Sequence, residues 1–156
     1  MNLSRHLVIA TILGVAVGVG IGFFLPQNLL DSDGSGRSVP ESESAGRIVD
    51  FDEEHFQRLL AQGEPLIIHA HADWCSFCRA QEPTLINLSQ QTELQDVHVL
   101  RINYDRQRDA LAQLRIGSQS TLIAFHAGEE VGRIVGETDP QRIQRLFKIS
   151  QSGTDS

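Results

Sequence analysis

The two cysteines of this chain stand three residues apart, in the run Trp74-Cys75-Ser76-Phe77-Cys78. A pair spaced C-x-x-C can close a disulfide with itself, reopen, and pass two electrons to a partner, or it can supply half of a zinc site. Structural zinc normally takes four ligands, and the sequence contains no second cysteine pair. The spacing therefore favours thiol–disulfide chemistry at Cys75 and Cys78.

The segments on either side of this motif predict how the sulfurs are positioned. Residues 66–72 are short and mostly apolar, which is typical of a buried strand, and a helix is expected from Cys75 to about residue 91, with a kink at Pro83. A helix beginning at Cys75 places that sulfur among free backbone N–H groups and at the positive end of the helix dipole, both of which favour the thiolate. Cys78, three residues on, lies on the same helical face.

The rest of the domain predicts an alternating α/β order. Asp52 and Asp139-Pro140 are helix-start signals, and apolar runs separated by turn residues indicate strands. The expected order β-α-β-α-β-α-β-β-α gives a mixed sheet with parallel central strands and helices on both faces. The predicted strands are 48–51, 66–72, 97–102, 121–125 and 131–135, and the predicted helices are 52–62, 75–91, 105–114 and 139–148.

The N-terminus carries an uncharged apolar run at residues 7–25. As a helix this run would span roughly 28 Å, about the thickness of a bilayer core. Arg5 precedes it and Asp31 and Asp33 follow it, so the positive-inside tendency places the N-terminus in the cytoplasm. We expect residues 1–25 to be an uncleaved transmembrane helix; a signal peptide cleaved near Gly20-x-Gly22 is the alternative.

Three further regions follow from composition. Residues 26–46 are rich in Ser, Gly, Pro and acidic residues and predict a flexible linker, residues 47–150 form the expected domain, and residues 151–156 a disordered tail. Gly14, Gly18 and Gly22 repeat every four residues and could form a contact surface for a homodimer in the membrane; the alternative is that glycine is simply frequent in membrane helices. The formal net charge is −7 with no basic stripe, which argues against nucleic acid as a partner.

From about Ile48 to Phe147 the chain resembles the thioredoxin family. The run Ala72-Asp73-Trp74-Cys75-x-x-Cys78 looks like the family's active site, most similar to that of periplasmic electron-carrier domains that reduce other thiol proteins. Pro83 falls where the family kinks its active-site helix. The other matching motifs are Asn103-Tyr104-Asp105, Thr121-Leu122-x-x-Phe125-x-x-Gly128 and Val135-Gly136.

This resemblance implies a thioredoxin-like fold and a thiol–disulfide oxidoreductase that needs no cofactor beyond its redox-active disulfide. Cys75 would be the nucleophile and Cys78 the resolving thiol, with Trp74 and Thr121 shaping the site. The implied partners are protein thiols and disulfides and a membrane thiol donor. The implied location is a bacterial inner membrane with the domain in the periplasm. We expect a reductant; a disulfide donor or isomerase is the alternative direction.

Two residues depart from the family pattern. Ser120 replaces the cis-proline that lies against the disulfide in the family, so it is expected either trans in an altered loop or cis under strain. His69 replaces the family's buried aspartate, and Arg101 stands where a lysine partners that aspartate. His69 could transfer a proton or tune the cysteine pKa values, with Arg101 favouring its neutral form, or it could be a core histidine with no chemical role.

The same residues are also compatible with a metal-binding function. Cys75, Cys78 and His69 together offer two soft sulfur ligands and an imidazole, a set suited to Cu(I). A glutathione-dependent enzyme is a third reading, opposed by Trp74 and by the lack of a basic site for the glutathione carboxylates.

Overall fold

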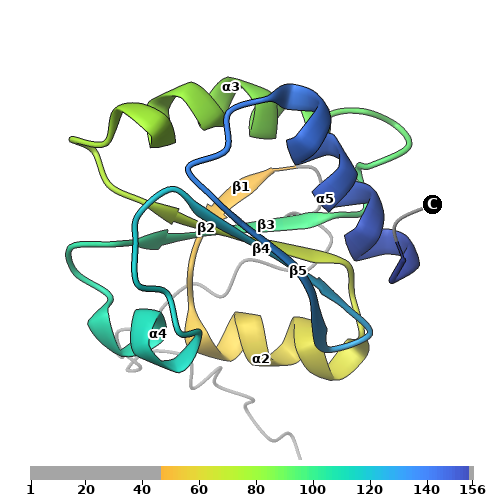
Figure 1. Ribbon diagram of the computed structural model, residues 1–156. Helices are drawn as coiled ribbons and strands as arrows, with labels where there is room; N and C mark the ends of the chain where they lie inside the picture. The colour runs from red at the N-terminus through yellow and green to blue at the C-terminus, as the bar shows by residue number, and fades with distance from the viewer. Residues whose placement is uncertain (1–46, 155–156) are drawn as a thin grey trace, which may run out of the picture. The chain divides into compact units, whose positions relative to one another are not determined.

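The computed structural model describes residues 47–154, which form a five-stranded sheet with helices on both faces (Figure 1). The predicted membrane helix (1–25) and linker (26–46) lie outside the described residues. Within residues 47–154, no helix is long and apolar enough to cross a membrane. In chain order the elements are β1 (Ile48–Asp50), α2 (Glu53–Gln62), β2 (Leu66–His71), α3 (Ser76–Ser89), β3 (His98–Asn103), α4 (Arg108–Gln113), β4 (Thr121–His126), β5 (Glu129–Val135) and α5 (Pro140–Ser152).

The strands lie in the order β1-β3-β2-β4-β5. β3 runs parallel to both β1 and β2, whereas β4 is antiparallel to β2 and to β5. The mixed sheet and the element order predicted from the sequence are therefore confirmed. The predicted ends differ in places: α4 begins at Arg108 rather than near residue 105, and α5 continues to Ser152, beyond the expected end of the domain.

Two apolar layers hold the helices against the sheet. On one face, α2 and α4 pack on side chains of β2, β3 and β4 such as Ile68 and Leu100; on the other, α3 and α5 pack on Ile67 and Leu122 (Figure 1). Alternation along β2 directs Ile67, His69 and His71 toward the α3 side, because successive strand residues face opposite ways. Two histidines thus enter the layer that carries the cysteine helix.

Local signals in the sequence account for the helix ends. The Asp52 carboxylate accepts a hydrogen bond from the His55 N–H at 2.8 Å and begins α2, and Gly63 ends that helix with φ of +73°. Gly128 turns β4 into β5 at φ of +82°. A side chain there would come within 2.8 Å of the Leu60 carbonyl oxygen, so the hairpin turn packs closely against the end of α2.

Candidate active site

Cys75 lies at the start of α3, directly after the loop that follows β2. It is the N-cap residue of that helix, and its Sγ accepts a hydrogen bond from the Cys78 N–H at 3.0 Å. The first N–H groups of a helix have no intrahelical acceptor, so an anionic sulfur at this position meets donors that the fold already provides. The expected placement of the first sulfur at the helix N-terminus is observed.

Cys78 lies one turn further along and is fully buried, whereas Cys75 retains 3% exposure. Both are free thiols. Burial raises the pKa of Cys78, and its side-chain hydrogen bond to Cys75 adds to the rise. The Cys78 thiol also points to the Ala70 carbonyl oxygen at 3.8 Å. Cys78 therefore keeps its proton more readily than Cys75 does. This difference makes Cys75 the nucleophile and Cys78 the resolving thiol.

The electrostatics of Cys75 are set by opposing effects. Burial raises the pKa of the Cys75 thiol, but hydrogen bonds from the Cys78 thiol, the Ser120 hydroxyl and the N–H groups of Cys78 and Phe77 outweigh it. The net result is a Cys75 pKa below its ordinary value. All of these donors are uncharged, so the thiolate is favoured without a cation beside it.

The Ser120 hydroxyl lies between the two sulfurs. Its Oγ is 3.1 Å from Cys75 Sγ and 3.5 Å from Cys78 Sγ. When Cys75 is a thiolate its sulfur can only accept, so the Ser120 O–H donates to it. The Cys78 thiol has a single proton, which it can direct either to Cys75 Sγ or to the Ser120 oxygen. Ser120 thereby connects the resolving thiol to the nucleophile through one hydroxyl group.

The peptide bond before Ser120, which stands in place of the family's cis-proline, is trans. No peptide bond among residues 47–154 is cis, and Ser120 has φ of +60° in the left-handed region. Proline is fixed near −65° and has no N–H, whereas the Ser120 N–H donates to the Ala70 carbonyl at 2.9 Å. Of the two expected outcomes the chain adopts the trans one, in an altered loop that proline could not enter.

His69 lies beside Cys78 at the middle of the sheet and is 1% exposed. Its pKa is lowered to about 3, chiefly by burial and then by the neighbouring His71, with Gln81 acting in the opposite direction and Arg101 contributing a smaller decrease. Although Gln81 is close enough to favour the charged ring, neither ring nitrogen has a hydrogen-bond partner among residues 47–154. His69 is therefore neutral at physiological pH and is a weak base for a thiol proton.

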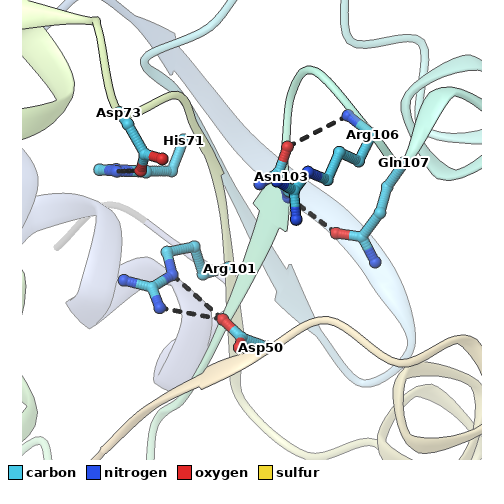
Figure 2. Close-up of a pocket in the computed structure, with 7 residues that line it drawn as sticks. All are labelled: Asp50, His71, Asp73, Arg101, Asn103, Arg106 and Gln107. Carbon is cyan, nitrogen blue, oxygen red and sulfur yellow. Dashed lines mark hydrogen bonds and ion pairs between the residues drawn. The ribbon is translucent and has the colours of Figure 1, made fainter.

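Arg101 lies directly across from His69 in the β2–β3 register. Its guanidinium does not hydrogen-bond the imidazole; it pairs with Asp50 at 3.0 Å and with Glu82 at 3.4 Å. Figure 2 shows Arg101 and Asp50 joined in this way on the wall of a pocket of about 340 Å³. Arg101 thus acts on His69 only through its charge.

The predicted shaping residues occupy distinct positions around the sulfurs. Trp74 is 59% exposed and donates its indole N–H to Asp105 at 3.0 Å. Thr121 donates its hydroxyl to the Ser118 carbonyl at 2.6 Å, which fixes the loop carrying Ser120. Pro83 lies within α3, two turns beyond Cys75.

Two buried neighbours of the site, Gln81 and His71, are not part of the motifs that the sequence analysis used. Gln81 is fully buried, and its amide N–H₂ donates to the carbonyl oxygens of Ser120 and Glu137 at 3.2 and 2.8 Å, which ties α3 to the Ser120 loop. Its spacing from Cys78, at i and i+3 on one helical face, was the available signal. His71 is also buried, and its ring centroid lies 5.3 Å from that of His69.

Comparison with known proteins places this geometry in a family. The family model for thioredoxin matches residues 47–148. The chain belongs to the thioredoxin family. Thioredoxin from Chlamydia pneumoniae is 34% identical over 94 residues, which cover 60% of this chain and 89% of that protein. The structure of Trxlp from Edwardsiella tarda EIB202 superposes with a TM-score of 0.63 at 36% identity, covering 64% of this chain and 97% of that one. Mitochondrial thioredoxin-3 of Saccharomyces cerevisiae is 26% identical over 93 residues, covering 60% of this chain and 71% of that protein.

Membership of the thioredoxin family, together with the Cys75–Cys78 pair, makes this chain a thiol–disulfide oxidoreductase. Thioredoxins carry out this reaction with their cysteines and no further cofactor. For the alternative function of Cu(I) binding, the structure brings together a different set of ligands from the predicted Cys75, Cys78 and His69. The ligand atoms that lie within 4.8 Å of one another belong to His69, His71 and Cys78, and Cys75 is outside that set.

Proposed function

We propose that this thioredoxin-family chain is a membrane-tethered reductant of protein disulfides, with its domain on the extracytoplasmic side of a bacterial inner membrane. The observation that carries the chemistry is the contrast between the two thiols. Cys75 at the helix N-terminus has a lowered pKa, whereas Cys78, buried behind it, has a raised one. A nucleophile and a protonated resolving thiol are what two-step disulfide reduction requires.

The first step begins with the Cys75 thiolate. It attacks one sulfur of a partner disulfide, the partner's S–S bond breaks, and the departing thiolate takes a proton from water. Cys78 then attacks Cys75 Sγ, its proton passing to the Ser120 oxygen as that hydroxyl gives up its own proton toward the second partner sulfur. The products are two partner thiols and a Cys75–Cys78 disulfide, so two electrons and the Cys78 proton leave the domain, and the other proton comes from water.

The donors around Cys75 support the reducing direction. A strongly oxidising couple needs a strongly stabilised reduced form. In this site burial opposes the thiolate, and the groups that favour it are neutral hydroxyl, thiol and backbone donors. The intervening side chains Ser76 and Phe77 add no charge to the site, so the reduced form gains only moderate stability.

Exposed aromatic side chains beside the nucleophile support a protein substrate. Trp74 and Phe77 are 59% and 54% exposed and stand on either side of Cys75 in the sequence. Large apolar groups at the surface are favourable contacts for a partner chain. A thiol donor in the membrane would complete the cycle by reducing the Cys75–Cys78 disulfide.

The tether rests on the sequence of residues 1–46. The uncharged run 7–25 is long enough to span a bilayer, Arg5 lies on its N-terminal side, and the acidic linker would separate the domain from the membrane. Gly14, Gly18 and Gly22 would give two such helices a smooth contact surface.

The reduction potential of the Cys75/Cys78 couple tests the direction of electron flow. The full-length chain in detergent is equilibrated with glutathione or dithiothreitol buffers, and the fraction of disulfide is measured by alkylation. A potential near or below roughly −230 mV supports a reductant, whereas about −120 to −180 mV refutes it in favour of a disulfide donor or isomerase. Protease digestion of sealed inner-membrane vesicles tests the orientation: an extracytoplasmic domain is protected in inverted vesicles and cleaved in right-side-out ones.

A further inference from the structure

A group of three metal-ligating side chains lies beneath the nucleophile. The ligand atoms of His69, His71 and Cys78 all lie within 4.8 Å of one another, and the three residues are 1%, 8% and 0% exposed. His69 and His71 come from one face of β2, and Cys78 comes from the first turn of α3, which covers that face. The fold therefore brings two imidazoles and a thiol together from two rigid elements.

Three of the four imidazole nitrogens in this group have no hydrogen-bond partner within the described part of the chain. Both ring nitrogens of His69, and Nδ1 of His71, are buried without a hydrogen-bond partner among residues 47–154. A buried polar atom left unpaired costs about 1–3 kcal/mol. Three such atoms beside one buried thiol are better explained by a ligand than by packing.

Asp73 prepares His71 for this role. Its carboxylate oxygen lies 3.5 Å from Nε2 of His71, and Figure 2 shows the two side chains joined; both line the pocket that Arg101 also lines. A carboxylate behind an imidazole fixes its tautomer and ring orientation in metal sites. In the tautomer with the proton on Nε2, which the nearby Asp73 carboxylate favours, the lone pair of Nδ1 is free for a metal.

We propose that the reduced chain binds one Cu(I) ion through His69, His71 and the Cys78 thiolate. Thiolate and imidazole together suit a soft cation, and Cu(I) exchanges with the Cys78 proton, which is released to solvent. The resulting complex of two neutral imidazoles, one thiolate and one monovalent cation has no net charge, which suits a buried site near the Arg101 guanidinium. Zn²⁺ would leave one positive charge there and would lack a fourth protein ligand.

The geometry requires only small adjustments. Metal–ligand bonds of about 2.1 Å in a trigonal arrangement place the ligand atoms about 3.6 Å apart, so separations of up to 4.8 Å close by side-chain rotation. His71 also lines the pocket shown in Figure 2, which gives the ion a route from the surface.

Copper binding and disulfide exchange then compete for one atom. Cys78 Sγ either ligates the metal or joins Cys75 in the disulfide. Cys75, the nucleophile, is not needed for the metal. Binding through this set is thus separable from the proposed reductase activity.

Cys75→Ser is the variant that separates them. The full-length chain is reduced, purified without oxygen, and titrated with Cu(I) against the chromophoric competitor bicinchoninate. We expect one Cu(I) per chain, an affinity for the Cys75→Ser variant within about threefold of wild type, and no reductase turnover. His69→Leu and His71→Leu should each weaken Cu(I) binding at least tenfold. His98→Gln, which alters a buried histidine on the neighbouring strand outside the group, should leave it unchanged.

Contrary results are equally clear. If Cys75→Ser loses the copper while the two histidine variants keep it, the C-x-x-C sulfurs bind the ion by themselves and the proposal is refuted. Tighter binding of Zn²⁺ than of Cu(I) would refute the choice of ion. X-ray absorption at the copper edge of the wild-type complex needs no variant to fold: two nitrogen and one sulfur neighbours support the site, and two sulfurs overturn it.

Discussion

Ser120→Ala removes the hydroxyl that bridges the two sulfurs, and its effect on Cys75 can be worked out from the site. The Ser120 oxygen lies 3.1 Å from Cys75 Sγ and is one of four neutral donor groups that lower the pKa of that thiol. A hydrogen bond to a charged group is worth about 1.5–3 kcal/mol, and a neutral thiol keeps part of that interaction. We take about 1.4 kcal/mol as the difference between the two protonation states, which corresponds to about one pKa unit.

The sign follows from which form is stabilised. The Ser120 hydroxyl favours the thiolate, so its loss raises the Cys75 pKa. At any pH below both values, a rise of one unit reduces the thiolate fraction about tenfold. The rate of alkylation of reduced protein by iodoacetamide, measured from pH 5 to 10, should therefore reach half its maximum about one pH unit higher in Ser120→Ala.

Ser118→Ala is the matched control. Ser118 is on the same loop, but its hydroxyl donates to the Gln119 carbonyl oxygen at 3.2 Å and has no bond to either sulfur. Its alkylation profile should match that of wild type. A Ser120→Ala midpoint that stays within 0.2 pH units of wild type (about a fifth of the unit expected), or moves downward, would refute the assignment of Ser120 as a thiolate donor.

Three further predictions use other parts of the domain. Cys78→Ser should accumulate mixed disulfides through Cys75 that are visible on non-reducing gels, and a variant that turns over normally would contradict its resolving role. In metal-free buffer, His69 binds a proton in the unfolded but not the folded chain between pH 6.5 and about 3, so stability falls as the pH falls. Urea unfolding should show wild type losing about 2 kcal/mol more than His69→Leu between pH 6 and pH 4, and equal losses would exclude a buried neutral His69. Asp52→Ala removes the cap on the His55 N–H and should lower the free energy of unfolding by about 1 kcal/mol, whereas the exposed Glu54→Ala should change it by less than about 0.5 kcal/mol.

Much of the fold could be predicted because local signals agree with the final packing. Asp52 and the Asp139-Pro140 pair begin helices as their residue types predict, and the short apolar run from Leu66 forms the central strand. The position of Cys75 at a helix N-terminus followed from the same reasoning. These features depend on neighbours in the sequence, which a periodicity argument can detect.

The parts that escaped prediction depend on contacts between distant segments. Ser120 reaches the sulfurs because its backbone adopts φ of +60°, a conformation that is uncommon for serine and could not be predicted from the residue type. Gln81 is explained by carbonyl groups 39 and 56 residues away. His71 and Asp73 are close in the sequence, but a metal site can be inferred only from the structure, which brings Cys78 and His69 next to His71.

The two outer strands of the sheet bear on how closely copies of this domain can be crowded together. An exposed strand edge offers unpaired backbone groups on which another chain can add a strand and start aggregation. One edge, β1, is only three residues long, and the other, β5, carries Glu129, Glu130 and Arg133. A short edge and a charged edge both resist such pairing. Domains held at high density on a two-dimensional surface would therefore not pair through their sheet edges, which leaves each cysteine pair open to its own partner.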